Sequence, residues 1–166
     1  MGVSVIIREL RYYQANGERH GYGLSAGAKL NVGAKDDFRE SATYGNGLGR
    51  YLALAFLNGA VIRDDLDLET INSFNGYASY LHHWNDKWRS SINYSFLNAD
   101  KETDFTGMEA NKSAWSASAN IINSPAPQLM FGLEFMYGNH ELESAVKGDF
   151  YRLQFSARYS FKYTSK

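Results

Sequence analysis

The sequence contains no cysteine, and only 2 of its 166 residues are proline. The lack of cysteine excludes disulfides, zinc sites built on thiolates and thiol nucleophiles. Neither sign of charge is in excess, since 17 Lys and Arg residues stand against 18 Asp and Glu residues. We therefore expect no basic surface for nucleic acid and no acidic disordered tail.

Long apolar runs are also missing. The longest apolar stretch, residues 52–62, is interrupted by Asn58 and Gly59, and it is shorter than the ~20 residues that a membrane-spanning helix requires. Residues 1–7 lack a basic segment followed by an apolar core and a cleavage site, so we expect no export signal there. An exported chain with this start would be a mature form or a fragment. Its length predicts one domain over residues 1–166.

Aromatic residues and glycine are abundant, with 12 Tyr, 10 Phe and 15 Gly. Together with the scarcity of proline, this balance favours twisted strands and tight turns over helices. Low average hydropathy does not argue against a membrane location, because a barrel strand exposes only every second residue to lipid. The composition predicts an all-β chain.

Alternation of apolar and polar residues predicts about eight strands. The clearest is residues 149–161, where Leu153 and Phe155 share one face while Arg152 and Arg158 share the other. The remaining predicted strands cover residues 3–13, 21–32, 37–45, 71–84, 87–98, 113–123 and 129–138. We expect Leu24, Ile92, Leu133, Phe135, Leu153 and Phe155 to lie together on an outward apolar face.

The predicted connections differ in length. Short turns are expected at residues 16–18, 33–35, 85–87 and 124–127, and longer loops at 46–68, 98–111 and 139–148. Short turns at one rim and longer loops at the other are typical of outer-membrane barrels, with the first connection as the exception. The pattern predicts an antiparallel up-and-down transmembrane β-barrel segment, either a small closed barrel or part of a larger porin barrel.

The polar residues indicate which face is turned to lipid. Placing Arg152 or Arg158 in lipid at mid-depth would cost roughly 2–4 kcal/mol each, whereas Tyr151 and Tyr159 suit the two membrane interfaces. A soluble β-sandwich, or a lipocalin-like barrel with its apolar face inside, is the alternative. The polar face is rich in Ser, Gly, Asn and Arg and poor in Lys–Glu pairs, which favours a lumen.

Four segments resemble a known family. They are YGNGLGRY at residues 44–51, WNDKWRS at 84–90, INSPAPQLMFGLEFMYG at 122–138 and RLQFSARYSF at 152–161. Their order and content resemble the C-terminal half of the DcaP-like porins of the Gram-negative outer membrane. The resemblance implies a larger barrel with about twice this number of strands, which assembles as a homotrimer. It also implies a passive channel for dicarboxylic and other small anionic solutes, with outer-membrane lipid as the surroundings.

Basic residues are the candidate solute site. If the arginines face inward, Arg39, Arg89, Arg152 and Arg158, with Lys29, form a ladder of cations that concentrates anions, because guanidinium groups bind carboxylates through two hydrogen bonds. The competing interpretation is that these cations pair with Glu134, Asp36 or Asp37 and have only a structural role.

Other candidate chemistry is weaker. The glycines at residues 45–49 lack the Lys and Ser or Thr of a phosphate loop and are better explained by a bend leaving a strand. His82 and His83 are adjacent in a predicted strand and point to opposite faces, so we expect no metal site. No spacing suggests a catalytic triad or paired acids, so we expect neither an enzyme nor a cofactor.

Two questions stay open at this stage. The apolar loop at residues 50–68 could fold into the lumen as a constriction or pack on a neighbouring subunit. The chain could also be a structural or anchoring barrel without transport, or a soluble β-barrel that binds a ligand. Detergent dependence and channel conductance separate these functions.

Overall fold

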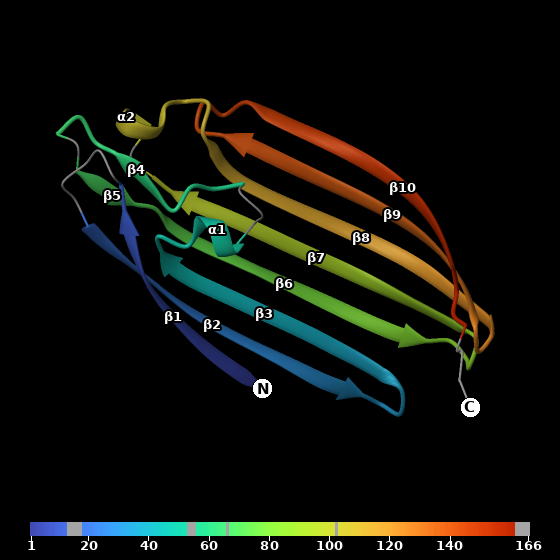
Figure 1. Cartoon of the computed structure of the whole chain (residues 1–166). Helices are drawn as coiled ribbons and strands as arrows, with labels where there is room; N and C mark the ends of the chain where they lie inside the picture. Colours follow the sequence, from blue (N-terminus) through green and yellow to red (C-terminus); the bar gives the residue numbers. More distant parts are fainter. Residues whose placement is uncertain (13–17, 53–55, 66, 102, 162–166) are drawn as a thin grey trace.

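The computed structural model describes residues 1–12, 18–52, 56–65, 67–101 and 103–161. It is dominated by an eight-stranded antiparallel sheet in the order β1-β2-β3-β6-β7-β8-β9-β10 (Figure 1). Sequential strands of this sheet are neighbours, so it is the predicted up-and-down meander. Its strands are β1 (Gly2–Arg11), β2 (Glu18–Val32), β3 (Asp36–Asn46), β6 (Asn72–His83), β7 (Trp88–Asp100), β8 (Asn111–Ala126), β9 (Leu129–Leu142) and β10 (Lys147–Tyr159).

Each predicted strand corresponds to one strand of the sheet, but two connections differ from the prediction. The loop expected at residues 139–148 is shorter, because the pairing of β9 with β10 continues to Glu141 and Lys147. The turn expected at 124–127 begins later, since β8 continues to Ala126 through a register irregularity after Asn123. Of the first predicted turn, Glu18 belongs to β2 and residues 16 and 17 lie outside the described residues.

The long connection between β3 and β6 contains structure that the alternation did not predict. This insertion (residues 47–71) holds α1 (Gly49–Leu52) and the paired strands β4 (Ala60–Ile62) and β5 (Leu68–Thr70). Its ends are joined by a 2.9 Å hydrogen bond from the Gly47 amide to the Ile71 carbonyl. Gly47 has a φ of 72°, which suits glycine and lets the chain turn out of β3. A second short helix, α2 (Thr103–Thr106), precedes β8.

The register places the six predicted outward residues on one face. Partners across an antiparallel ladder share a face, and Leu153 pairs with Phe135, Phe135 with Ala119, and Ala119 with Ile92. The six side chains are 46–71 % exposed. A soluble sandwich would bury this face in its core, so the prediction of an outward apolar face is confirmed. We call it the apolar face.

The apolar face carries aromatic residues near both ends of its strands. Rings are in sequential contact near the ends that join the longer loops, with centroids 6.0 Å apart for Tyr94 and Trp115, 5.3 Å for Trp115 and Tyr137, and 5.0 Å for Tyr137 and Tyr151. Trp88 and Tyr159 lie at the ends that join the short turns. Two aromatic belts around an apolar middle are what a membrane-spanning barrel presents to lipid.

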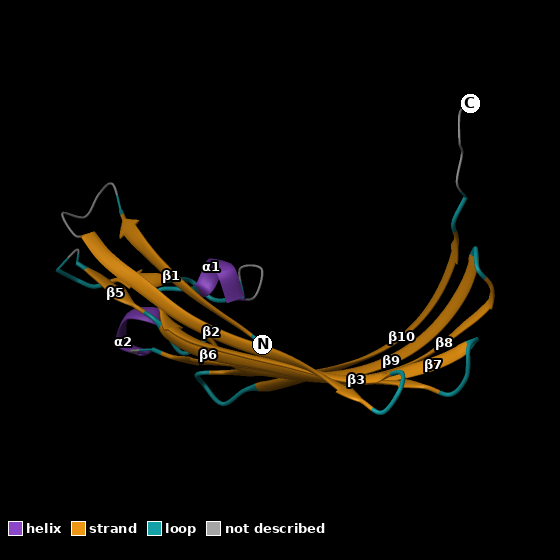
Figure 2. Cartoon of the chain, turned by 90° about the horizontal axis from the view of Figure 1, so that it is seen from below, coloured by secondary structure: helices purple, strands orange, loops and turns teal. Residues whose placement is uncertain are grey.

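The opposite face, which we call the polar face, is concave. Leu48 precedes α1 and is 1 % exposed. It packs over Gly23 and Gly45, which pair in register, and a Cβ added to either glycine would overlap its Cδ1 atom. Figure 2 shows α1 inside the curve of the sheet. The main buried apolar residues, Leu48, Leu57, Leu68, Ile71 and Leu97, therefore gather where the insertion meets the concave side.

The sheet forms an arc (Figure 2). Within the described residues, β1 pairs with β2 and β10 pairs with β9, and neither edge has a second partner. The small closed barrel, one of two forms that the sequence left open, is thus not the form observed. Two free edges are what a segment of a larger barrel would offer to further strands.

Candidate functional site on the polar face

Small polar side chains cover the middle of the polar face. Cross-strand neighbours on this face are hydrogen-bonded to each other, as expected for hydroxyl and amide groups placed opposite one another. The bonded pairs are Thr43 and Ser25 (2.8 Å), Ser79 and Asn93 (2.6 Å), Asn93 and Ser118 (3.1 Å), Ser95 and Ser116 (2.9 Å), and Asn120 and Ser91 (2.8 Å). This network gives the concave side a surface that water wets.

Lys29 and Arg39 share one buried carboxylate. They are register partners on β2 and β3, and both bind Asp37, whose Oδ1 atom lies 2.7 Å from Arg39 Nε and whose Oδ2 atom lies 3.3 Å from Lys29 Nζ. Two cations and one anion leave a single positive charge at this position. The structural pairing weighed for Arg39 is thus present, although it is incomplete.

Arg152 is paired with Glu134 in the way the structural interpretation expected. Arg152 Nη2 lies 2.9 Å from Glu134 Oε1, and both side chains are on the polar face of β10 and β9. The pair is partly exposed, so its contribution to stability is small. Because the Glu134 carboxylate offsets the charge of its guanidinium group, Arg152 adds little to the net positive charge of the polar face.

Arg89 and Arg158 have no carboxylate partner among the described residues. Arg89 donates to Ser124 Oγ at 3.2 Å and to Met130 Sδ at 3.3 Å, and Arg158 pairs in register with Met130. Arg89 and Arg158 thus lie on strands on either side of Met130, near the short-turn rim. Among the five predicted site residues, these two are cations whose charge is not neutralised.

The five predicted residues do not form one cluster. Lys29 and Arg39 lie on β2 and β3, toward one end of the arc, whereas Arg89 is on β7 and the other two are on β10. Together with the acids that pair with some of them, Asp37 and Glu134, they leave the polar face with an excess of positive charge.

Three arginines that the sequence analysis missed also lie on this side. Arg8 donates to the Gly47 carbonyl at 3.2 Å and stands 5.3 Å from the Tyr51 ring, a cation–π distance. Arg19 bonds the Leu68 carbonyl at 3.0 Å and forms an ion pair with Asp67. Arg50, in α1, is exposed. The first two hold the insertion against β1 and β2, and no local sequence pattern indicates such contacts.

The described residues of the insertion lie over the polar face, which favours the first of the two arrangements weighed for residues 50–68, folding toward the concave side. Beyond α1, the ring of Phe56 makes an edge contact with His140 of β9, with centroids 5.3 Å apart and planes at 74°. The Phe56 carbonyl accepts a 2.7 Å hydrogen bond from Asn111 at the start of β8. The segment thus reaches from β3 to the β8–β9 side of the sheet.

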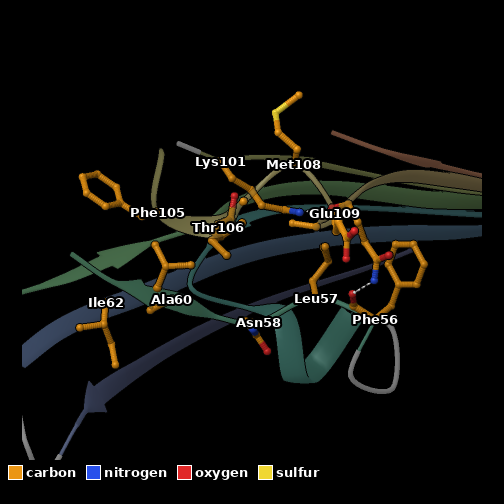
Figure 3. A pocket seen from close by; sticks show the side chains of 15 residues that line it. Phe56, Leu57, Asn58, Ala60, Ile62, Lys101, Phe105, Thr106, Met108 and Glu109 are labelled. Carbon is orange, nitrogen blue, oxygen red and sulfur yellow. Dashed lines mark hydrogen bonds between the residues drawn. The ribbon is translucent and has the colours of Figure 1, made fainter. Parts of the chain in front are cut away.

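Two pockets adjoin the insertion. The first, the rim pocket, has a volume of about 890 Å³ and lies between the insertion and residues 101–111 (Figure 3). The second, the sheet pocket, has a volume of about 850 Å³ and is lined by Arg50, Tyr77 and His140 among others. Phe56 lines both pockets.

A buried lysine forms part of the rim pocket. The side chain of Lys101 is 3 % exposed; Nζ donates to the Asn111 carbonyl and lies 3.8 Å from Glu143 Oε1. Burial lowers the pKa of the Lys101 ammonium, and the Glu143 carboxylate acts in the opposite direction. The pair links the loop after β7 to the loop after β9.

The histidine pair has a structural environment. His82 Nδ1 lies 2.6 Å from Asp36 Oδ2, Tyr80 donates to the same oxygen at 3.0 Å, and the His83 amide donates to Asp36 Oδ1 at 2.8 Å. These contacts tie the start of β3 to the end of β6. Within the described parts of the chain, no group of three or more His, Cys, Asp or Glu residues could hold a metal ion.

Neither short helix could span a membrane, and no described helix is long and apolar enough to do so.

Comparison with known proteins agrees with this geometry. The crystal structure of the outer membrane channel DcaP of Acinetobacter baumannii is similar in fold, with a TM-score of 0.89 at 20% sequence identity. The match covers 96% of this chain and 46% of that one, so this chain spans about half the length of its structural relative. No curated protein sequence matches. Residues 10–161 match the family described as DcaP outer membrane protein; the chain belongs to this family, whose place is the bacterial outer membrane.

Proposed function

We propose that this chain forms part of the wall of a passive outer-membrane channel for small anionic solutes, of which dicarboxylates are the leading class. The apolar face would contact lipid and the polar face would line the lumen. As the family resemblance implies, the intact channel would be a homotrimer.

The observation that carries the proposal is the pair of unneutralised guanidinium groups of Arg89 and Arg158 on the concave side. A cation in a lumen with low-dielectric walls raises the local concentration of anions. Guanidinium groups bind carboxylates through two parallel hydrogen bonds. Two such residues, on strands on either side of Met130, would suit a solute with two carboxylates.

Removing these two charges is expected to reduce anion preference. In the intact channel in a planar bilayer, we expect the anion-to-cation permeability ratio of the double variant Arg89→Gln and Arg158→Gln to fall toward one. The difference from the parent should be largest at low salt, because the Debye length shortens from ~30 Å at 0.01 M to ~10 Å at 0.1 M. Reversal potentials across a salt gradient measure this ratio.

A charge-preserving pair of substitutions is the control. Arg89→Lys with Arg158→Lys keeps both positive charges but loses the two-pronged geometry, so its permeability ratio should stay near that of the parent while binding of dicarboxylates weakens. An unchanged ratio at low salt in the Gln variant would refute the role of these arginines. Absence of any conductance in the parent would refute the channel itself.

A further inference from the structure

Phe56 stands between the two pockets of the concave side. The rim pocket is lined by Lys101, Phe105 and Met108, and the sheet pocket by Tyr77 and Phe150, but Phe56 belongs to both. The rim pocket is at the longer-loop rim and the sheet pocket lies on the polar face. Among the described residues, Phe56 is the one that the linings of the two pockets share.

The backbone of Phe56 is held in place. Asn111 Nδ2 donates to the Phe56 carbonyl at 2.7 Å, marked by the dashed line in Figure 3. The Oδ1 atom of the same Asn111 lies 2.7 Å from His140 Nε2, and the Asn111 carbonyl accepts a hydrogen bond from the buried Lys101. Asn111 therefore connects the insertion to both β8 and β9.

The ring of Phe56 is held separately. Its edge contact with His140 fixes it on one side, and the next residue, Leu57, is buried at 4 % exposure. The ring is thus held by its contact with His140 and by the buried residue next to it.

We propose that Phe56 is the residue that sets the size limit for solutes, because its ring forms the partition between the rim pocket and the sheet pocket. The proposal rests on the proposed channel function and concerns size alone, since Phe56 carries no charge. It predicts that the Phe56 ring controls which solutes move between the two pockets. Aromatic rings that line only one of the pockets should not have this effect.

Three substitutions of the same kind test the proposal. Phe56→Ala removes the ring but keeps the carbonyl that Asn111 binds, so the insertion stays attached. Phe105→Ala and Phe150→Ala remove the same side-chain volume from the rim pocket alone and the sheet pocket alone. Single-channel conductance, and the largest uncharged sugar that swells proteoliposomes containing the intact channel, are measured for all three and for the parent.

We expect Phe56→Ala to raise the conductance and shift the sugar cut-off to larger sizes, while the two control variants stay at parental values. Phe56→Leu, which keeps an apolar contact and is the milder change, should shift the cut-off in the same direction by less. Phe56→Trp should lower it. If Phe56→Ala does not assemble, the cut-offs of Phe56→Leu and Phe56→Trp test whether the side chain at residue 56 sets the size limit.

The outcomes separate the size limit from the channel function. A conducting parent whose conductance and cut-off are unaffected by every Phe56 variant would overturn the role of Phe56 and leave the channel intact. An equal increase of conductance and cut-off in all three Ala variants would also overturn it. The increase would then result from the loss of side-chain volume anywhere in the pockets, and not from removal of the ring between them. A parent that admits neither ions nor sugars would overturn both proposals.

Discussion

Replacing Leu153 with arginine is expected to abolish or strongly reduce assembly in lipid. Leu153 is the central residue of β10, on the apolar face, and it is 71 % exposed. An arginine at the middle of the lipid-facing band of a barrel costs roughly 2–4 kcal/mol, a large share of the total stability of a protein. Folding of the intact channel into liposomes of defined composition, followed by gel mobility of folded and unfolded forms, measures the effect.

The neighbouring residue provides the matched control. Gln154 lies on the polar face opposite Glu134, so Gln154→Arg adds the same side chain one residue along the same strand. There it faces water and a carboxylate, and assembly should stay close to that of the parent. Equal loss in both variants, or tolerance of both, would contradict the assignment of the two faces.

Replacing Gly45 with alanine is expected to destabilise the contact between the insertion and the sheet. A Cβ at Gly45 would overlap Leu48 Cδ1 and the Tyr22 carbonyl oxygen, and the second of these is backbone that has little freedom to move. Overpacking of a tight site typically costs about 1–3 kcal/mol. We expect a lower thermal unfolding midpoint in detergent, measured by circular dichroism.

Two further variants show whether Leu48 is the cause. Gly148→Ala adds a Cβ on β10 that meets no atom within 4 Å, so its unfolding midpoint should match the parent. In a Leu48→Ala background, where the overlap with Leu48 is gone, adding Gly45→Ala should lower the midpoint by less than it does in the parent. If Gly45→Ala and Gly148→Ala have equal midpoints, Leu48 is not packed against Gly45 as the structure shows.

The strands and their facing could be predicted because both depend on local information. Side chains alternate between the faces of a strand, so Leu153 and Arg152 are assigned to opposite sides by sequence position alone. The eight strands were found for the same reason. The loop after β9 came out shorter than predicted because polar residues near Asn139 resemble a loop, whereas pairing with β10 keeps them in the sheet.

The insertion could not be predicted, because its position depends on contacts far apart in the sequence. Arg19 contacts Leu68, and Phe56 contacts Asn111 and His140; none of these contacts follows a helical or strand period. The glycines at 23 and 45 were visible in the sequence, yet their role as a seat for Leu48 requires the register of β2 and β3.

Charge pairing was predictable in part. Asp37 and Arg39 are two residues apart in a strand and so share a face, which makes their ion pair a local feature. The pair of Arg152 with Glu134 needs the register of β9 and β10. For the same reason, the sequence could not show that Arg89 and Arg158 stay free of carboxylates.

The most direct test of the central claim is the accessibility of alternate residues along β10 in a lipid bilayer. The 166-residue sequence contains no cysteine, so single cysteines placed at residues 151–158 can each carry a fluorescent label without background from this chain. Labels at 151, 153, 155 and 157 should be quenched by nitroxide lipids, and those at 152, 154, 156 and 158 by a water-soluble quencher. Quenching without alternation, or with the two sets reversed, would contradict a β-barrel wall with lipid on its apolar face and a water-filled lumen on its polar face.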